Sequence, residues 1–405
     1  MTPVGFESQT VAAADSHRDV SAVELSVVIP CLNEAETVGI CIAKAKEVIA
    51  EEEINAEIIV ADNGSLDGSQ QIARDLGARV VTVVEKGYGH ALMGGIAAAR
   101  GRYVVMGDAD DSYDFGEIPR FLRKLREGND LVQGCRLPGG GGQILPKAMP
   151  FLHRWLGNPL FTFLVRHMFG SPIHDVYCGL RGFSKRLYDD LDLRCTGMEF
   201  ATEMVIKSSL FQAKIAEVPI TLHPDGRKST RPHLRTFRDG WRTLRFFLMY
   251  SPRWLFLVPG LLFILLGLLG YGLALPGVTI AGATLDAHSL LFASLAILLG
   301  YQSVQFAVFT KTFAIAEGLL PMDRRMERLF RVFNLERGLL IGCVGLTAGL
   351  VLLGLSVNQW RLADFGALDY ARTMRLVIPG VTLSSLGVQT ILSSFFVSIL
   401  GMARK

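Results

Sequence analysis

The chain has 405 residues, half of them hydrophobic, and a formal net charge of +3 that says little by itself. This length is enough for two or three domain-sized units. The six cysteines include no Cys-x-x-Cys pair and no zinc-ligand spacing, which argues against a redox motif or a zinc site. Residues 1–24 lack a basic start and an apolar core, so we expect a disordered tail and no signal peptide.

Short apolar runs alternate with helical segments over residues 25–106. We expect strands at 25–30, 57–61, 79–84 and 102–106, and helices at 33–49, 69–76 and 89–99. This alternation predicts right-handed crossovers and an α/β fold with a mainly parallel sheet and flanking helices. Ligands bind such sheets outside the carboxyl ends of the strands. Three polar turns fall there, at 33–34, 62–65 and 108–110, and together they predict a nucleotide site.

An acidic turn, Asp108-Ala109-Asp110, directly follows the fourth predicted strand. Two carboxylates at the edge of a sheet suit a divalent cation that holds a diphosphate. Further along, residues 139–142 are four consecutive glycines. Glycine runs hold regular structure poorly, so the segment is either a mobile loop near the site or a surface linker.

The last third of the chain contains four long apolar runs with few charges. We expect membrane spans at 255–275, 289–309, 338–357 and 376–400, each near the ~20 residues that a bilayer requires. The connection before the second span carries no Lys or Arg, the next carries six and the third carries three. The positive-inside rule then predicts a multi-pass protein of the cell membrane with both termini and the N-terminal domain in the cytoplasm.

Basic and aromatic residues alternate just before the first span. This pattern fits an anionic membrane surface, or ordinary positive flanking of a span, better than nucleic acid. We therefore divide the chain into a tail at 1–24, an α/β domain at 25–230, an interfacial segment at 231–253 and a four-span domain at 254–405. No charge lies deep in a span, which favours a membrane anchor over a transport path. Small residues on the spans would allow helices to pack closely, so a homo-oligomer is possible. The basic residues are Arg227, Lys228, Arg231, Arg235, Arg238, Arg242, Arg245 and Arg253.

Taken together, the three polar turns resemble the motifs of family 2 glycosyltransferases, which have a GT-A fold. The segments 134–136 (Gly-Cys-Arg) and 175–181 (Asp-Val-Tyr-Cys-Gly-Leu-Arg) further resemble the polyprenyl-phosphate, or dolichol-phosphate, sugar synthase branch. The resemblance covers about residues 24–250. It implies an inverting enzyme that moves a hexose from a UDP- or GDP-sugar to a polyprenyl phosphate at the cytoplasmic membrane face.

The resemblance also implies roles for the residues on the donor side. Two departures from the family pattern are Asn63, where Asp is frequent, and Asp111-Ser112, where Leu-Gln is usual. Asn33 could equally cap a helix. The implied donor-side residues are Pro30, Asn33 and Glu34 around the base and ribose, Asp62 at the base, and Asp108 and Asp110 as ligands of Mg²⁺ or Mn²⁺.

A lipid phosphate is already anionic near neutral pH, so the acceptor side needs cations more than a base. Asp175 is a candidate to activate or position the acceptor, with a salt bridge to Arg181 as the structural alternative. Each arginine taken alone could instead form a surface salt bridge. The implied acceptor residues are Arg136, Arg154, Asn158 and Arg227, and the candidate catalytic residues are Asp110, Asp175 and Arg136.

Two other functions remain open. The enzyme could use a hydroxyl of a lipid or glycan as acceptor, which requires a positioned base. Alternatively, the chain could be a non-catalytic membrane scaffold built on a transferase fold. The intact Asp108, Asp110 and Arg136 argue against the scaffold.

Overall fold

The computed structural model describes residues 23–227, 236–280, 282–322, 327–328 and 334–401. Most of the expected tail, and Lys228, Arg231 and Arg235 of the basic segment, lie outside the described residues. The chain divides into two compact units, which we describe separately. The first comprises Met1–Asn158, Ile173–Met204 and Ala213–Arg231, and the second Pro159–Pro172, Val205–Gln212 and Pro232–Lys405.

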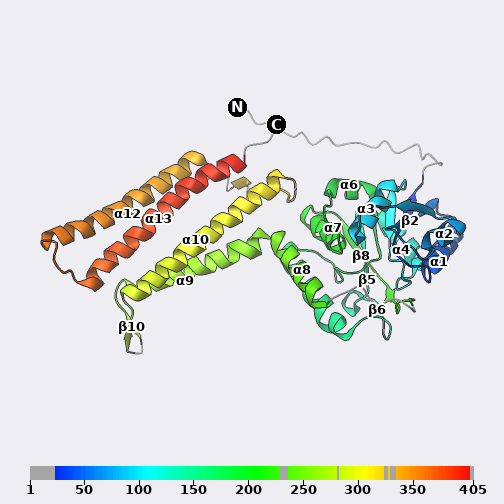
Figure 1. The fold of residues 1–405 in the computed structure, drawn as a ribbon, viewed down its shortest axis with the longest axis horizontal. Coiled ribbons are helices and arrows are strands. Elements are labelled where there is room, and N and C mark those ends of the chain that lie inside the picture. The colour runs from blue at the N-terminus through cyan, green and yellow to red at the C-terminus, as the bar shows by residue number, and fades with distance from the viewer. Residues whose placement is uncertain (1–22, 228–235, 281, 323–326, 329–333, 402–405) are drawn as a thin grey trace. The chain divides into compact units, whose positions relative to one another are not determined.

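The first unit is built on a seven-stranded sheet with the strand order β3-β2-β1-β4-β7-β5-β8 (Figure 1). Neighbouring strands are parallel except at β7, which runs antiparallel to both β4 and β5. The mainly parallel sheet expected from the sequence is confirmed. The strands are β1 (Leu25–Cys31), β2 (Ala56–Asp62), β3 (Arg79–Thr82), β4 (Tyr103–Met106), β5 (Leu131–Cys135), β7 (Arg181–Ser184) and β8 (Ile215–Pro219), and a separate pair is formed by β6 (Gln143–Ile144) and β9 (Thr221–Leu222).

Helices flank the sheet and bury its apolar residues. The main core joins alternate residues of β1, such as Val27 and Ile29, to the apolar sides of α1 and α4. Helix α3 packs closely on Val28 and Ala61, where a Cβ on Gly95 would lie only 2.6 Å and 2.9 Å from their side chains. The helices are α1 (Val38–Glu51), α2 (Ser69–Asp75), α3 (Tyr88–Ala98), α4 (Ile118–Arg126), α6 (Lys185–Leu191) and α7 (Glu199–Leu210), the last of which extends into the second unit.

The start of the first helix differs from the prediction. Helix α1 begins at Val38, with Thr37 at its N-cap, and not at residue 33. Asn33 has a φ of +58°, in the left-handed region that a helix does not use. Asn33 is therefore not a helix cap; its side chain joins the turn after β1 to the turn after β2.

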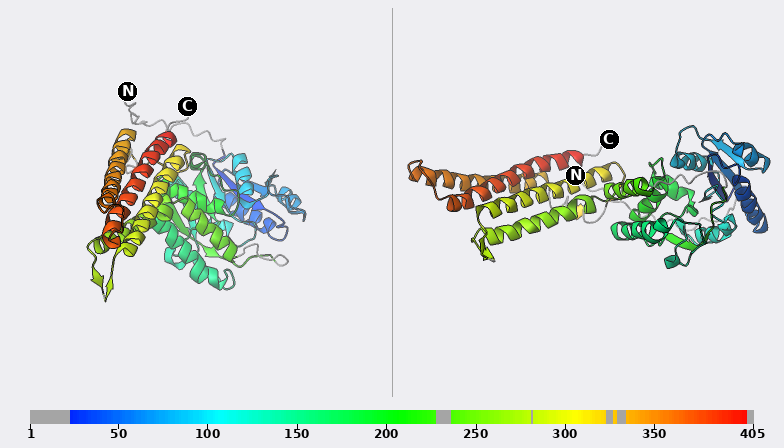
Figure 2. Two further views of the ribbon diagram at one scale, coloured as in Figure 1. Left: turned by 60° about the vertical axis from the view of Figure 1, so that its left-hand side comes forward. Right: turned by 60° about the horizontal axis from the view of Figure 1, so that its bottom comes forward.

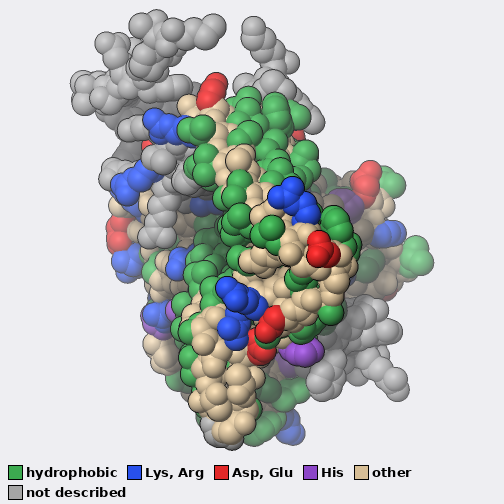
Figure 3. Space-filling model, turned by 90° about the vertical axis from the view of Figure 1, so that its left-hand side faces the viewer, with side chains coloured by type: hydrophobic (Ala, Val, Ile, Leu, Met, Phe, Trp, Pro, Cys, Tyr) green, Lys and Arg blue, Asp and Glu red, His purple; other side chains and the backbone are tan. Residues whose placement is uncertain are grey.

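Within its described residues, the second unit contains four helices long and apolar enough to cross a membrane, so the four expected spans are confirmed. Helices α12 and α13 lie side by side along their lengths in all views (Figures 1 and 2). Hydrophobic side chains gather over the long helices in the space-filling view (Figure 3). The helices of this unit are α5 (Asn158–Phe169), α8 (Thr236–Met249), α9 (Val258–Ala274), α10 (Ala287–Ala316), α12 (Leu335–Leu362) and α13 (Tyr370–Leu400).

Small residues and hydroxyl groups join the spans. A Cβ on Gly387 would lie 2.7 Å from the carbonyl oxygen of Gly342, so α12 and α13 approach closely there. The Tyr271 hydroxyl shares a hydrogen bond of 2.6 Å with Ser294 and one of 3.1 Å with Thr382. These contacts link α9 to α10 and α13 without placing a charge inside the apolar region.

Candidate active site

The turn after β4 presents the two predicted metal ligands, and a hydroxyl group fixes each of them. The Tyr88 hydroxyl, from the first residue of α3, donates to Asp108 Oδ1 at 2.8 Å. The Ser112 amide and hydroxyl both donate to Asp110 Oδ1, at 3.0 Å and 2.6 Å. Gly179 packs on the other side, where a Cβ would lie 2.5 Å from Asp108 Oδ2. The acidic turn is therefore held in place before any ligand arrives.

The electrostatics of this turn favour a cation. Burial, followed by the negative charge of Asp110, raises the pKa of Asp108 from 3.8 to about 6. Among the described residues, no cluster of three or more His, Cys, Asp or Glu side chains is arranged to hold a metal. Mg²⁺ is commonly bound through one or two carboxylates together with substrate phosphates. Asp108 and Asp110 thus fit an ion whose other ligands come from a diphosphate.

The structure accounts for Asp111-Ser112, the unusual pair that follows the acidic turn. Ser112 is buried and supports Asp110 through the two hydrogen bonds given above. Asp111 has a φ of +59°, and its carboxylate contacts Lys44 Nζ on α1 at 2.8 Å. Ser112 therefore steadies the Asp110 carboxylate, and Asp111 ties the turn to α1.

The turns after β1 and β2 are joined by side-chain to backbone hydrogen bonds. Ser65 Oγ accepts from the Asn33 amide at 2.9 Å, and Asn33 Oδ1 accepts from the Leu66 amide at 2.9 Å. Asp67 and Ser69 accept from the amides of Ala35 and Glu34, again at 2.9 Å. Pro30 is buried within β1 beside them. The predicted base and ribose residues therefore sit on two turns that support each other.

Asp62 and Asn63 both organise these turns. Asp62 is fully buried, and its carboxylate accepts from the Gly64 and Ser65 amides and from Gln70 Nε2, the last at 2.7 Å. Asn63 Nδ2 donates to the carbonyl oxygens of Val83 at 3.1 Å and Glu85 at 2.7 Å. Asn63 Oδ1 accepts from the Gly87 amide at 2.8 Å. The two donated bonds require the amide of Asn, because an ionised Asp has no N–H to donate.

Arg136 and Asp175 form a buried ion pair. Arg136 Nε and Nη2 contact the two oxygens of Asp175 at 2.7 Å and 2.9 Å, and the Arg136 amide donates to the same carboxylate. Burial opposes the charge of Arg136, but the Asp175 carboxylate outweighs it and raises the Arg136 pKa. The salt bridge between Asp175 and Arg181, considered as an alternative, is not formed. Arg181 donates instead to backbone carbonyls of Ala201 and Cys178.

Arg227 contacts two residues that were predicted for the donor side. Its Nη2 donates to Asp110 Oδ2 at 3.0 Å, and its Nε lies 3.4 Å from Glu34 Oε2. Burial raises the pKa of Glu34 from 4.5 to about 7; Arg227 opposes this shift and Asp110 adds to it. The structure thus brings together three predicted residues that the sequence had assigned to separate nucleotide, metal and acceptor roles.

Two predicted acceptor residues make contacts of their own. Arg154 stacks over the Trp155 ring at 5.6 Å, and Asn158 Nδ2 contacts Met149 Sδ at 3.1 Å. In the described part of the chain, neither makes a hydrogen bond or ion pair with the acidic turn. The glycine run does approach the site: Gly142 packs directly on the backbone of Cys135 and Arg136, where a side chain would not fit.

Sequence reasoning missed Tyr88 and the His174–Glu217 pair. Tyr88 stands between two glycines after the third strand, a position that could have signalled close packing on the acidic turn. His174 Nδ1 lies 2.6 Å from Glu217 Oε2, and the His174 amide donates to the other oxygen. His174 is the neighbour in sequence of Asp175, so the pair lies beside the Arg136 ion pair.

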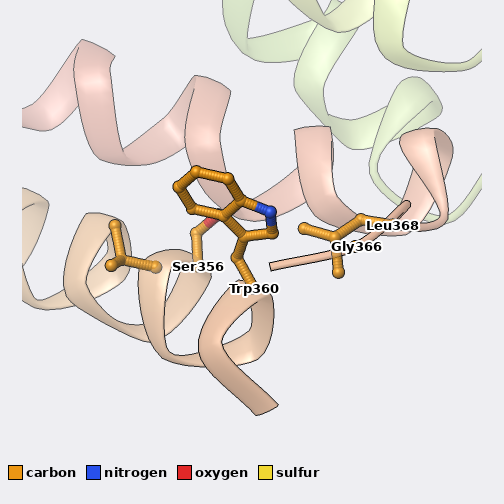
Figure 4. Close-up of a pocket in the computed structure, with 5 residues that line it drawn as sticks. Ser356, Trp360, Gly366 and Leu368 are labelled. Atoms are coloured by element: carbon orange, nitrogen blue, oxygen red, sulfur yellow. The ribbon is translucent and has the colours of Figure 1, made fainter. Parts of the chain in front are cut away.

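The membrane unit has a shallow cavity of its own, at the end of α12 (Figure 4). It has a volume of about 360 Å³ and is lined by Ser356, Val357, Trp360, Gly366 and Leu368. None of these side chains is titratable, and none belongs to the predicted site. The cavity therefore offers no acid, base or metal ligand for catalysis.

Comparison with known proteins identifies two matching families. Residues 26–192 match the family described as glycosyl transferase family 2, and residues 308–401 match its C-terminal transmembrane region. The low-salt glycan biosynthesis hexosyltransferase Agl6 of Haloferax volcanii is 36% identical over 94% of this chain and 90% of its own length. A dolichyl-phosphate hexose transferase of the same organism is 33% identical over 49% of this chain and 82% of its own.

Among solved structures, glucosyl-3-phosphoglycerate synthase from Mycobacterium tuberculosis, in complex with Mn²⁺ and UDP, superimposes with a TM-score of 0.43. It is 23% identical and covers 57% of this chain and 78% of its own. The parallel sheet, the acidic turn and the sequence matches define a membrane-anchored glycosyltransferase with a GT-A fold. The chain belongs to glycosyltransferase family 2.

Proposed function

We propose that this enzyme transfers a hexose, with inversion, from a UDP- or GDP-sugar to polyprenyl or dolichyl phosphate. The main support is the pair Asp108 and Asp110, held by Tyr88 and Ser112 and placed beside the guanidinium of Arg227. A pair of carboxylates that could hold a cation on a diphosphate, next to an arginine that could bind a second phosphate, suits a reaction between two phosphate-bearing substrates. The names of the two Haloferax relatives, a hexosyltransferase and a dolichyl-phosphate hexose transferase, are consistent with this activity.

On the donor side, Asp108 and Asp110 would hold Mg²⁺ or Mn²⁺, which when bound neutralises charge on the departing nucleotide diphosphate. The joined turns keep Pro30, Asn33 and Glu34 in position around the base and ribose. Asp62 acts through the turn at 64–65, because its oxygens accept hydrogen bonds from that turn and from Gln70. This rigidity lowers the entropic cost of orienting the sugar.

On the acceptor side, the lipid phosphate is already ionised near pH 7 and needs orientation more than deprotonation. Its oxygen attacks the anomeric carbon as the bond from that carbon to the nucleotide diphosphate breaks, which inverts the configuration. The proposed contacts for the phosphate are Arg136, Arg227, Arg154 and Asn158. Both oxygens of Asp175 accept hydrogen bonds from the Arg136 guanidinium. We therefore assign Asp175 to positioning Arg136 and not to proton transfer.

We further propose that the α/β domain faces the cytoplasm. The connection between the second and third spans carries six Lys or Arg residues, and the connection between the first and second carries none. The polyprenyl phosphate would then be used in the cytoplasmic leaflet.

One observation favours a second candidate, transfer to a hydroxyl group. A histidine whose Nδ1 is held by a carboxylate can accept a proton at Nε2, as a general base does. His174 has this arrangement with Glu217, at 2.6 Å, and its side chain is 37% exposed. A hydroxyl acceptor near His174 would use the pair in this way.

The two candidates give chemically different products. Purified full-length protein would be incubated with polyprenyl phosphate, or with the corresponding free polyprenol, and a panel of UDP- and GDP-sugars, and the lipid product identified by mass spectrometry. We expect a single hexose joined through an acid-labile sugar–phosphate bond. An acid-stable glycoside would support the hydroxyl acceptor, and no binding of any nucleotide sugar by calorimetry would support a scaffold.

A further inference from the structure

Arg227 pairs with three carboxylates, one of which belongs to the predicted metal ligand Asp110. Its Nη2 lies 3.0 Å from Asp110 Oδ2, and its Nε lies 3.4 Å from Glu34 Oε2 and 3.1 Å from Asp225 Oδ1. Only 12% of the Arg227 side chain is exposed, and Glu34 and Asp110 are 11% and 17% exposed. The guanidinium is therefore enclosed by carboxylates and is not directed into solvent toward an acceptor.

The choice of oxygen matters for what a metal ion could do. Asp110 Oδ1 already accepts two hydrogen bonds from Ser112, so Oδ2 is the oxygen left for a cation. Arg227 holds that oxygen. Two cations on one carboxylate oxygen repel each other strongly in a partly buried site, so an ion that binds at Asp110 has to move Arg227.

The backbone beside Arg227 is anchored, so this movement falls on the side chain. The Gly226 amide donates to the Asp110 carbonyl oxygen at 2.9 Å, and the Arg227 amide donates to Asp225 Oδ1 at 2.9 Å. A Cβ on Gly226 would lie 3.3 Å from that carbonyl oxygen and from Asp111 Cβ. The long Arg227 side chain can thus rotate while its Cα stays beside the acidic turn.

We propose that Arg227 is a resident counter-cation of the donor site, and that a divalent cation displaces it and frees it for the acceptor phosphate. This inference rests on the proposed function. Displacement of Arg227 makes binding ordered, because Arg227 can bind the acceptor phosphate only after the cation has bound on the donor side. Before that, Arg227 stabilises the empty site by neutralising Glu34 and Asp110, which would otherwise repel each other.

The first test measures Mn²⁺ binding to the full-length protein by the electron paramagnetic resonance signal of free Mn²⁺. Arg227→Gln removes the competing cation, so we expect Mn²⁺ to bind about tenfold more tightly than to wild type, the scale of one lost charge-assisted hydrogen bond. Lys44→Gln is the matched control, because Lys44 binds Asp111, next in sequence to Asp110, without touching a metal carboxylate. Lys44→Gln should leave Mn²⁺ affinity unchanged.

Equal or weaker Mn²⁺ binding by a folded Arg227→Gln protein would overturn the inference, as would an equal gain in Lys44→Gln. Asp110→Asn separates this failure from failure of the proposed function. If Asp110→Asn loses Mn²⁺ binding while Arg227→Gln gains none, only the displacement is wrong. If Asp110→Asn binds Mn²⁺ like wild type, the metal assignment itself is wrong. Thermal unfolding shows that each variant is folded.

The second test measures coupling between the two sides with a short-chain prenyl phosphate as the probe. We expect wild type to bind the probe several-fold more tightly when Mn²⁺ is present. Arg227→Gln should bind it weakly and with the same affinity whether or not Mn²⁺ is added. The displacement of Arg227 is contradicted if wild type binds the probe equally well with and without Mn²⁺. It is also contradicted if Arg227→Gln still binds the probe more tightly when Mn²⁺ is present.

Discussion

Replacing Asn63 by Asp should destabilise the catalytic domain, although the change is nearly isosteric and restores the family's frequent residue. Asn63 is only 4% exposed, and its Nδ2 donates to the carbonyls of Val83 and Glu85 at 3.1 Å and 2.7 Å. A carboxylate there loses both donors and faces two carbonyl oxygens. Each unsatisfied buried partner costs about 1–3 kcal/mol, so we expect a loss of about 2–6 kcal/mol.

The assay is thermal unfolding of the full-length protein in detergent. For a domain of this size about 1 kcal/mol shifts Tm by roughly 2–4 °C, so Tm should fall by at least about 4 °C. Asn33→Asp is the matched control, because Asn33 Oδ1 accepts from the Leu66 amide and an Asp keeps that acceptor. If the Tm of Asn63→Asp lies within about 1 °C of the Tm of the control, the assignment of Asn63 as a hydrogen-bond donor is refuted.

Two further predictions each concern a single side chain. Tyr88→Phe removes the hydroxyl that holds Asp108, and loss of such a supporting contact should weaken Mn²⁺ binding about 10- to 100-fold; unchanged Mn²⁺ affinity would remove Tyr88 from the site. For Glu57, burial disfavours the charge, but hydrogen bonds from the Arg100 amide, Arg79 and Ser26 prevail and lower its pKa below 4.5. A lowered folded-state pKa stabilises the fold above the unfolded pKa. Glu57→Gln should therefore lower Tm at pH 7, with the difference from wild type shrinking as pH falls below about 4.5. A constant difference across this range would contradict the assignment.

The sequence predicted the features that depend on local pattern. The apolar run before Asp108 places the acidic turn at the end of β4, and strands alternating with helices bring the turns after β1, β2 and β4 to one edge of the sheet. Long apolar runs likewise predict the four spans, because a helix of that length and composition needs no partner to be recognised.

Contacts between distant segments could not be predicted in the same way. Asp175 pairs with Arg136, 39 residues earlier, and not with nearby Arg181. Tyr88 reaches Asp108 across 20 residues. The start of α1 was missed because Asn33 adopts a left-handed φ and bonds Leu66, a choice that depends on the neighbouring turn. These contacts depend on how α3, β5 and the 175–181 segment pack against one another. The local pattern of a single sequence does not reveal such packing.

The activity proposed for this enzyme is metal-dependent transfer of a hexose to a lipid phosphate through Asp108 and Asp110. The most direct measurement compares wild type and Asp110→Asn in forming glycosyl polyprenyl phosphate, after treatment with a chelator and then with Mn²⁺ restored. We predict that wild type is inactive without the ion and active once it is restored, and that folded Asp110→Asn is inactive in both conditions. Full activity of chelated wild type, or of Asp110→Asn, would contradict metal-dependent transfer through these two carboxylates.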